Sequence, residues 1–254
     1  MSVLRIAWHQ QNPEWEKPEI NLQTLTDVAP RLGECDVWIL PEMFATGFTM
    51  NLEMAKSGLH ALEWMKQMAK EREMVLAGSL AYPGAGGPVN RFFWVNSRGE
   101  AVHYDKRNLF ELAGETKHFM AGNQRVLLSF RGWNIALFVC YDLRFGAWMY
   151  RRPHFNYDLA LVVANWPERR SRAWKTLLSA RAIENQCYVL GVNRVGTDGN
   201  GLPYSGDSRL IGPLGDSIIE NKVFEAENGK AVIDLEELQE VRRRFPFWTG
   251  GLDE

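Results

Sequence analysis

The feature that most constrains the fold is a recurring set of short apolar runs rich in β-forming residues. Several are nearly continuous rather than alternating, which is typical of strands buried on both faces or packed face to face. Helical patterns lie between them, so the sequence predicts a mixed α/β fold. The expected strands are Val3–Trp8, Val37–Leu40, Met74–Leu80, Phe92–Val95, Val126–Phe130, Asn134–Val139, Leu159–Val163 and Cys187–Val192.

Two segments have the composition or the periodicity of helices. Ala61–Lys70 is rich in helix-forming residues. Ala173–Gln186 has an apolar stripe, and Arg181 and Glu184 are expected on other faces of this helix. The stripe consists of Trp174, Leu177, Leu178 and Ala182.

Turn residues separate several of the predicted elements. Asn96–Gly99 and Gly212–Gly215 are expected to be turns. Tyr82–Pro88 is rich in Gly and Pro without the spacing of a phosphate-binding motif, so we expect a surface loop. Because no linker or repeat interrupts the chain, we expect one domain over residues 1–254. Its core spans about residues 3–233, and a tail of about residues 234–254 holds Arg242–Arg244 as a solvated helix end.

Composition and charge exclude several classes of protein. The formal net charge is -2, which gives no strong attraction to nucleic acid or to acidic membranes. No apolar run approaches the ~20 residues of a membrane span, and the first residues lack the pattern of a signal peptide. The three cysteines, Cys35, Cys140 and Cys187, are widely spaced, which argues against a disulfide framework. We therefore expect a cytoplasmic protein that binds neither nucleic acid nor membrane.

Three chemically reactive side chains stand at the ends of apolar runs. Glu42, Lys106 and Cys140 each follow such a run directly. The carboxyl ends of strands in α/β sheets are where ligand crevices open. Charged side chains beside a core are costly unless they have partners. This placement makes the three residues candidates for one site.

The context of Cys140 resembles a nucleophile elbow, in which a sharp turn exposes the side chain and leaves backbone N–H groups free for an oxyanion. The alternative is a buried structural cysteine, the role that we expect for Cys35 and Cys187. Glu42 is either a solvated carboxylate or a general base. Lys106 is either a surface cation or a fixed positive charge beside a thiolate and an oxyanion.

Taken together, five sequence blocks resemble a known family. Pro41–Phe44, Asp105–Phe110 and Cys140–Phe145 are similar to the three signature blocks of the nitrilase, or carbon–nitrogen hydrolase, superfamily, in the order Glu, Lys, Cys. Ala164–Pro167 and Ala180–Tyr188 are similar to further blocks of this family. The resemblance extends over the whole predicted core.

The resemblance implies a four-layer αββα sandwich with a Glu–Lys–Cys triad at the strand ends. It also implies a homodimer or a larger homo-oligomer. A second glutamate often supports the lysine in this family, and Glu115 is the matching residue here. The chain departs from the family at Gly146, where a proline is common, so the loop beyond the nucleophile is expected to differ.

The block Pro41–Met50 resembles the bacterial omega-amidase subgroup, which hydrolyses the terminal amide of 2-oxoglutaramate and of related dicarboxylic acid monoamides. Such an amide carries a carboxylate, so the pocket needs a cation. Arg169, Arg170 and Arg172 are the candidates, with a solvated basic turn as the alternative for each. Arg144 is a less favoured candidate, because its place in the Cys140–Phe145 block indicates a structural role. Trp166 is the tryptophan expected near the site.

The resemblance implies a cysteine mechanism without a cofactor. Glu42 takes the proton of Cys140, the sulfur attacks the amide carbon, and Lys106 and the backbone N–H of Tyr141 stabilise the oxyanion. A thioester remains and water releases the acid. No metal site is expected, because the five histidines are scattered without ligand spacing.

Other functions share part of this evidence. A nitrile hydrolase or an N-carbamoyl amino-acid hydrolase would carry the same triad. A binding protein without activity on the same fold is disfavoured because all three triad residues are present. A papain-like Cys–His pair is not excluded by spacing alone, but it would leave the Glu and Lys blocks unexplained.

Overall fold

The first β-sheet, sheet A, combines strands from both ends of the described chain. A computed structural model describes residues 3–247. The six strands of sheet A are, in order, β14 (Glu227–Asp234), β1 (Val3–Gln10), β2 (Val37–Ile39), β3 (Val75–Gly84), β4 (Gly87–Val95) and β5 (Ala101–Asp105). β1, β2 and β3 are parallel, and the remaining pairs are antiparallel.

The second sheet, sheet B, has the same organisation. Its six strands are, in order, β13 (Ser217–Glu220), β12 (Arg209–Ile211), β9 (Tyr188–Asn193), β8 (Leu159–Ala164), β7 (Trp133–Val139) and β6 (Leu127–Phe130). The central strands β7, β8 and β9 are parallel, and the outer pairs are antiparallel. A separate hairpin is formed by β10 (Val195–Thr197) and β11 (Pro203–Ser205).

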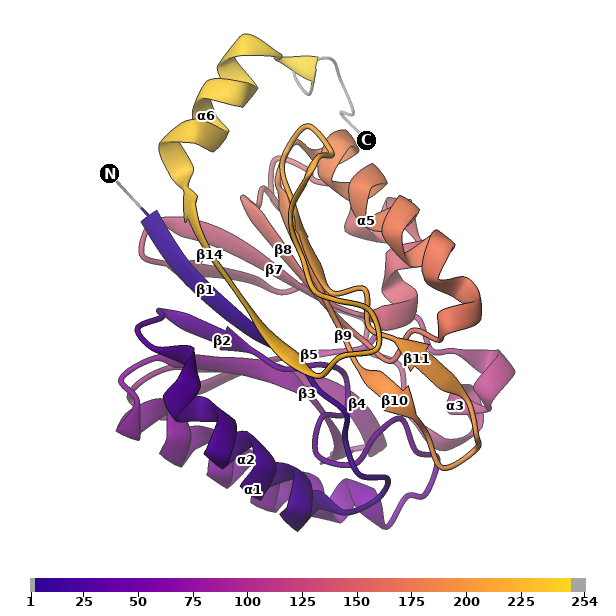
Figure 1. Ribbon diagram of the computed structural model, residues 1–254. Coiled ribbons are helices and arrows are strands. Elements are labelled where there is room, and N and C mark those ends of the chain that lie inside the picture. Colours follow the sequence, from indigo (N-terminus) through magenta and orange to yellow (C-terminus); the bar gives the residue numbers. More distant parts are fainter. Residues whose placement is uncertain (1–2, 248–254) are drawn as a thin grey trace.

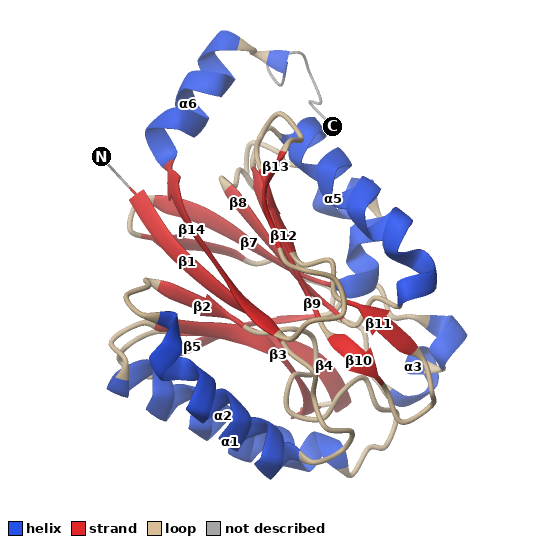
Figure 2. Ribbon diagram, in the orientation of Figure 1, coloured by secondary structure: helices blue, strands red, loops and turns tan. Residues whose placement is uncertain are grey.

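Helices cover the outer face of each sheet. The covering helices are α1 (Pro18–Val28), α2 (Met54–Glu71) and α5 (Ser171–Asn185). The helix α6 (Leu235–Arg244) follows β14 beyond the strand ends (Figure 1), and the short helices are α3 (Glu115–His118) and α4 (Gly146–Met149). α1 and α2 lie against sheet A, whereas α5 lies against sheet B on the opposite side (Figures 1 and 2). The layers are therefore helix, sheet, sheet, helix, which confirms the arrangement that the family resemblance implies.

The core explains why the strands read as continuous apolar runs. Ile6 and Trp8 of β1 pack inward with Leu137 of β7, in a cluster shared by both sheets. Ala7 between them packs outward with Leu25 of α1 and Met65 of α2. Both faces of the central strands are buried, so alternation disappears from the sequence. All of the predicted strands are present, and their ends differ from the prediction by only a few residues at most positions.

The prediction of a surface loop at Tyr82–Pro88 is wrong. β3 continues to Gly84 and β4 begins at Gly87, so a long hairpin turns within two residues. Pro83 and Pro88 face each other in the register of this hairpin. Composition suggested a loop because Gly and Pro disfavour strands, but they are tolerated at the end of a hairpin. The predicted turns at Asn96–Gly99 and Gly212–Gly215 are both present.

Two arginines, one predicted to lie off the apolar stripe of its helix and one predicted to be solvated, are anchored to the protein. Arg181 is buried on α5, and its guanidinium donates to the carbonyl oxygen of Leu143 from Nε at 3.1 Å and Nη2 at 2.9 Å. Arg242 of α6 forms an ion pair with buried Asp158 at 2.6 Å. Periodicity identifies a helix face, but it does not reveal a cation that reaches a carbonyl or a carboxylate elsewhere.

Several elements were not predicted from the sequence. α1 and the strands β10 to β14 are absent from the prediction, and α2 begins at Met54 rather than Ala61. β14 has the alternating burial of a strand with one solvent face, and its charged residues obscured the pattern. Within residues 3–247, no helix is long and apolar enough to cross a membrane.

Candidate active site

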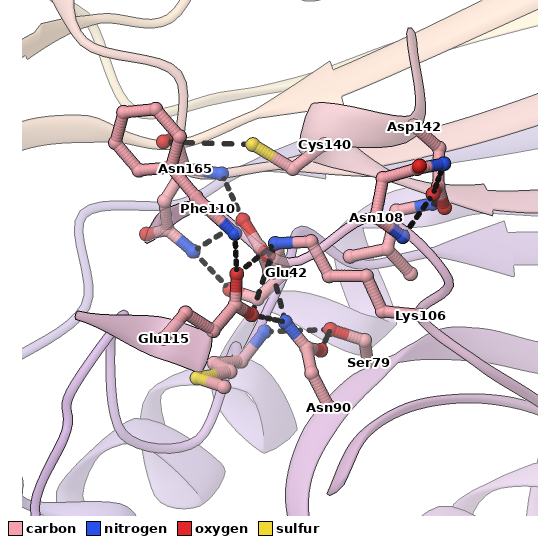
Figure 3. Close-up of polar contacts among 12 residues, drawn as sticks. Glu42, Ser79, Asn90, Lys106, Asn108, Phe110, Glu115, Cys140, Asp142 and Asn165 are labelled. Carbon is pink, nitrogen blue, oxygen red and sulfur yellow. Dashed lines mark hydrogen bonds and ion pairs between the residues drawn. The ribbon is translucent and has the colours of Figure 1, made fainter. Parts of the chain in front are cut away.

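The predicted triad residues meet where the two sheets face each other. Glu42 follows β2 and Lys106 follows β5, both in sheet A, whereas Cys140 follows β7 in sheet B. Glu115 enters from the first residue of α3. Figure 3 shows these four side chains converging, with Asn165 beside them. The sequence therefore identified residues that the fold brings together from separate segments.

Lys106 is the centre of a buried charge cluster. Its Nζ lies 2.8 Å from Oε1 of Glu42 and 2.9 Å from Oε2 of Glu115, and all three side chains are fully buried. Burial alone would lower the pKa of Lys106, but the attraction of Glu115 and Glu42 outweighs it and holds this pKa above its usual value. The lysine is therefore a permanent cation at neutral pH.

Glu42 is fixed by neutral amide groups as well as by the lysine. Its Oε1 accepts from Nδ2 of Asn90 at 2.8 Å, and its Oε2 accepts from the backbone N–H of Asn165 at 2.8 Å. Nδ2 of Asn165 also donates to the backbone carbonyl of Glu42 at 2.6 Å. Neither asparagine was a predicted site residue, although Asn165 lies within the Ala164–Pro167 block. No motif around Asn90 in the sequence marks it as a site residue, because its place beside Glu42 depends on how the strands pair.

Glu115 is the second carboxylate in contact with Lys106. It accepts from Nδ2 of Asn90 at 3.1 Å and from the backbone N–H of Phe110 at 2.6 Å. Burial raises the pKa of Glu115, while the charge of Lys106 opposes this rise. The contact with the lysine supports the assignment that the sequence resemblance implied.

Cys140 stands on a strained turn. Its φ is 45°, in the left-handed region that non-glycine residues rarely adopt, and it begins the short 3-10 helix Cys140–Arg144. The turn is the sharp elbow expected from the sequence. Sγ lies 3.8 Å from the backbone carbonyl oxygen of Asn165. Burial raises the pKa of the Cys140 thiol well above its usual range, and the charge of Glu42 adds to this rise. The resting sulfur is a thiol beside a carboxylate that can accept its proton.

The cavity beside Cys140 has two adjoining parts, which share Phe110 and Arg170 in their lining. Its narrow inner part is lined by Cys140, Tyr141, Trp166, Arg144 and Arg170, among others. The outer part has a volume of about 560 Å³. Its wall is formed mainly by the segments 48–51 and 110–113, the start of the helix after β8, and the β10–β11 hairpin. Cys140 therefore lies in the wall of the small inner part, next to the larger outer part.

The predicted arginines occupy different positions along this cavity. Arg170 lines both parts of it, and its guanidinium lies 4.8 Å from the ring centre of Phe110. Burial lowers the pKa of Arg170, and the nearby charge of Arg169 adds to this effect. Arg169 lines only the outer part, and Arg172 is exposed and lines neither part.

Two neighbours of the sulfur complete the inner wall. Trp166 is buried, as expected near the site, and its Nε1 donates to the carbonyl oxygen of Arg170 at 2.9 Å. Arg144 lies 5.0 Å from the ring centre of Trp166. The sequence indicated a structural position for Arg144, whereas the fold places it in the inner cavity. Within residues 3–247, no group of His, Cys, Asp and Glu has the arrangement of a metal site.

Comparison with known proteins identifies the family. Residues 5–243 match the carbon-nitrogen hydrolase family. The chain is 45% identical to Omega-amidase YafV of Escherichia coli strain K12, covering 98% of this chain and 96% of that protein. It is 34% identical to 2-oxoglutaramate amidase of Bacillus subtilis strain 168, covering 84% of this chain and 83% of that protein.

A solved structure agrees with the sequence matches. A CN-hydrolase superfamily protein from Xanthomonas campestris, with an arsenic adduct in its active site, superimposes with a TM-score of 0.94 at 38% identity. The match covers 99% of this chain and 98% of that chain. The resemblance seen in the sequence blocks is thereby confirmed. The chain belongs to the carbon–nitrogen hydrolase family.

Proposed function

We propose that this protein is an omega-amidase that hydrolyses the terminal amide of 2-oxoglutaramate and of related dicarboxylic acid monoamides. The observation that carries the proposal is the buried Glu42–Lys106–Glu115 cluster beside Cys140, next to a cavity lined by arginines. The names of the relatives from Escherichia coli and Bacillus subtilis support this substrate class.

The first chemical step forms a bond between Sγ of Cys140 and the amide carbon. Glu42 accepts the thiol proton as the sulfur attacks, so a free thiolate does not have to accumulate in this buried site. The carbonyl oxygen becomes an oxyanion. Lys106 supplies a fixed positive charge to it, and the backbone N–H of Tyr141, on the turn after the sulfur, supplies a hydrogen bond.

The remaining steps return the site to its starting state. The C–N bond breaks as Glu42 passes its proton to the leaving nitrogen, which departs as ammonia and leaves a thioester. Glu42 then takes a proton from a water molecule whose oxygen attacks the thioester carbon. The C–S bond breaks, the acid leaves, and the proton on Glu42 returns to the sulfur. No cofactor enters this sequence.

The substrate carboxylate is held by Arg170 and Arg144 in this proposal. Both line the inner cavity with Cys140, so a carboxylate bound between them lies a few bonds from the attacked carbon. A guanidinium provides paired donors that match a carboxylate. Arg169 is placed farther out, where it attracts the substrate, and Arg172 has no role in binding.

The same proposal covers location and assembly. A cytoplasmic location is supported by three cysteines that form no disulfide. A homodimer is supported by the exposed apolar side chains of Ile183 on α5 and nearby Leu214, which a second copy would cover. Light scattering of the purified protein measures the mass of the assembly, and a monomer at micromolar concentration contradicts this part.

The activity is tested by measuring ammonia release from 2-oxoglutaramate by the wild-type protein and by Cys140→Ala. We expect turnover in the first and none in the second. Parallel assays use a nitrile and an N-carbamoyl amino acid of similar length, because both alternatives would employ the same triad. Faster turnover of either compound than of 2-oxoglutaramate contradicts the proposed substrate class.

A further inference from the structure

The proposed catalytic groups are divided between two sheets, and within residues 3–247 no strand of one sheet is hydrogen-bonded to a strand of the other. Glu42 and Lys106 follow strands of sheet A, and Cys140 follows a strand of sheet B. The distance between the sulfur and the ammonium therefore depends on contacts that cross from one sheet to the other. Apolar packing holds the sheets together, but it is not directional. The hydrogen bonds from Asn165, after β8, already align sheet B with Glu42. A second directional contact, at Lys106, would fix the placement of the ammonium.

Asp142 provides such a contact. It lies two residues after Cys140 on the same turn and is fully buried. Its Oδ2 accepts from the hydroxyl of Tyr104 at 2.7 Å, and its Oδ1 accepts from the backbone N–H and Nδ2 of Asn108 at 2.9 and 2.8 Å. Tyr104 and Asn108 stand two residues before and two residues after Lys106. One carboxylate therefore holds both flanks of the lysine.

The same carboxylate also restrains the nucleophile turn. Oδ2 of Asp142 accepts from the backbone N–H of Val139 at 2.9 Å, which closes a ring around Cys140. Cys140 has the left-handed φ described above, a conformation that persists only when its surroundings enforce it. Figure 3 shows Asp142 joining the Cys140 turn to Asn108.

The contacts of Asp142 are those of an anion. A carboxylate has only acceptors, and all four of its described contacts are donors directed at it. Tyr104 is in turn fixed, because its oxygen accepts from the backbone N–H of Arg107 and from Nε1 of Trp148, both at 3.1 Å. A buried charge with this many charge-assisted bonds has little freedom to move.

We propose that Asp142 is a positioning residue that sets the placement of Cys140 relative to Lys106 by linking sheet B to sheet A. It acts through the Val139–Cys140 turn and through Tyr104 and Asn108, and it does not touch the substrate. The inference rests on the proposed function, in which Cys140 attacks and Lys106 stabilises the oxyanion. A misplacement of about 1 Å is enough to cost about 100-fold in rate.

The test is Asp142→Asn, which preserves size but turns one acceptor into a donor. The new amide group faces either the Val139 and Tyr104 donors or the Asn108 donors, so one half of the link is broken. We expect kcat for 2-oxoglutaramate to fall by about 100-fold while KM changes by less than threefold. Alkylation of Cys140 by iodoacetamide, measured by mass spectrometry, is expected to slow by about tenfold.

Asp158→Asn is the matched control. Asp158 is also a buried aspartate of sheet B that accepts from a backbone N–H, that of Asn134 at 2.9 Å, and it has a cationic partner in Arg242. It precedes β8, at the end of the sheet opposite the site. This variant should lose thermal stability, yet its folded form should keep kcat and the alkylation rate of the wild type.

The outcomes separate positioning from general stability. If Asp142→Asn has kcat within threefold of the wild type, or if Asp158→Asn loses kcat to the same extent, the inference is overturned. If Asp142→Asn does not fold, Tyr104→Phe and Asn108→Ala carry the test. Each removes one donor and should lower kcat by about tenfold at constant KM, and kcat within twofold of the wild type in both overturns the inference.

Failure of the proposed function has a different signature. In that case the wild-type protein releases no ammonia, or Cys140→Ala releases it as fast as the wild type. The alkylation rates of Asp142→Asn and Asp158→Asn still report on the placement of the sulfur. Equal rates in these two variants overturn the positioning role even without turnover.

Discussion

Replacing Lys106 with methionine separates two consequences of one buried charge. The side chain is fully buried between the carboxylates of Glu42 and Glu115. Methionine fills similar space but leaves the carboxylates without their cation. Removal of one partner from a buried ion pair costs about 3–5 kcal/mol of stability. In a chain of this size, about 2–4 °C of Tm is lost for each kcal/mol, so Tm should fall by about 6–20 °C.

The catalytic loss has a separate origin. A fixed donor aimed at an oxyanion lowers the activation barrier by about 3 kcal/mol. Its loss in Lys106→Met should therefore lower kcat by about 100-fold. The double variant Lys106→Met with Glu115→Gln removes the cation and one of the two carboxylates together. It should recover at least half of the lost stability, because only one buried charge remains, yet it should stay as inactive as Lys106→Met.

The assay combines ammonia release from 2-oxoglutaramate with thermal unfolding of each variant. Two results refute the reasoning. The first is a kcat for Lys106→Met within threefold of the wild type, which would be too small for a cation at the oxyanion. The second is a double variant that regains kcat along with Tm, since activity would then depend on folding rather than on the charge of Lys106.

Further predictions concern the thiols and the arginines. Cys140→Ala should remain folded without turnover, and iodoacetamide should label Cys140 before Cys187; retained turnover contradicts its role as nucleophile. Arg170→Ala should lower kcat/KM for 2-oxoglutaramate by about 100-fold but affect an uncharged amide of equal length far less. The control Arg172→Ala should preserve kcat/KM for both substrates. An equal loss for the two substrates in Arg170→Ala points to a structural defect. Burial raises the pKa of Cys187 to about 12, above the 9.0 of the free thiol. The contribution of the buried thiol to the free energy of unfolding is therefore complete below pH 9 and is lost as pH rises toward 12. The unfolding free energies of Cys187→Ala and the wild type should therefore converge between pH 8 and pH 10.5 in urea titrations, and a constant difference argues against this titration.

The candidate site was predictable where chemistry and strand ends coincide. Glu42 and Cys140 each follow a buried strand, and Lys106 follows the more exposed strand β5, so their order and position could be read directly from the sequence. Glu115 required the family resemblance, because the loop before α3 has no periodic pattern. Arg144 was assigned a structural role because nothing in its local sequence shows that the side chain reaches the cavity.

The groups that hold the site in place were not predictable in the same way. The backbone N–H of Asn165 contacts Glu42 across 123 positions of the sequence, and Asp142 reaches Asn108 across 34. Such hydrogen bonds depend on how the sheets pack, which composition and periodicity do not encode. The burial of Arg181 was missed for the same reason, since its acceptor belongs to Leu143 on another element.

The pairing of β1 with β14 has a consequence for synthesis on the ribosome. Val3 pairs with Asp234 and Gln10 pairs with Glu227, so one edge of β1 has no partner until the chain as far as Asp234 has emerged. Its other edge pairs with β2, whose residues are made early. During translation, β1 therefore exposes a row of unpaired backbone groups, the kind of edge that recruits other chains. Arrival of β14 closes this edge, so truncation before Glu227 should yield a nascent chain that aggregates or depends on chaperones.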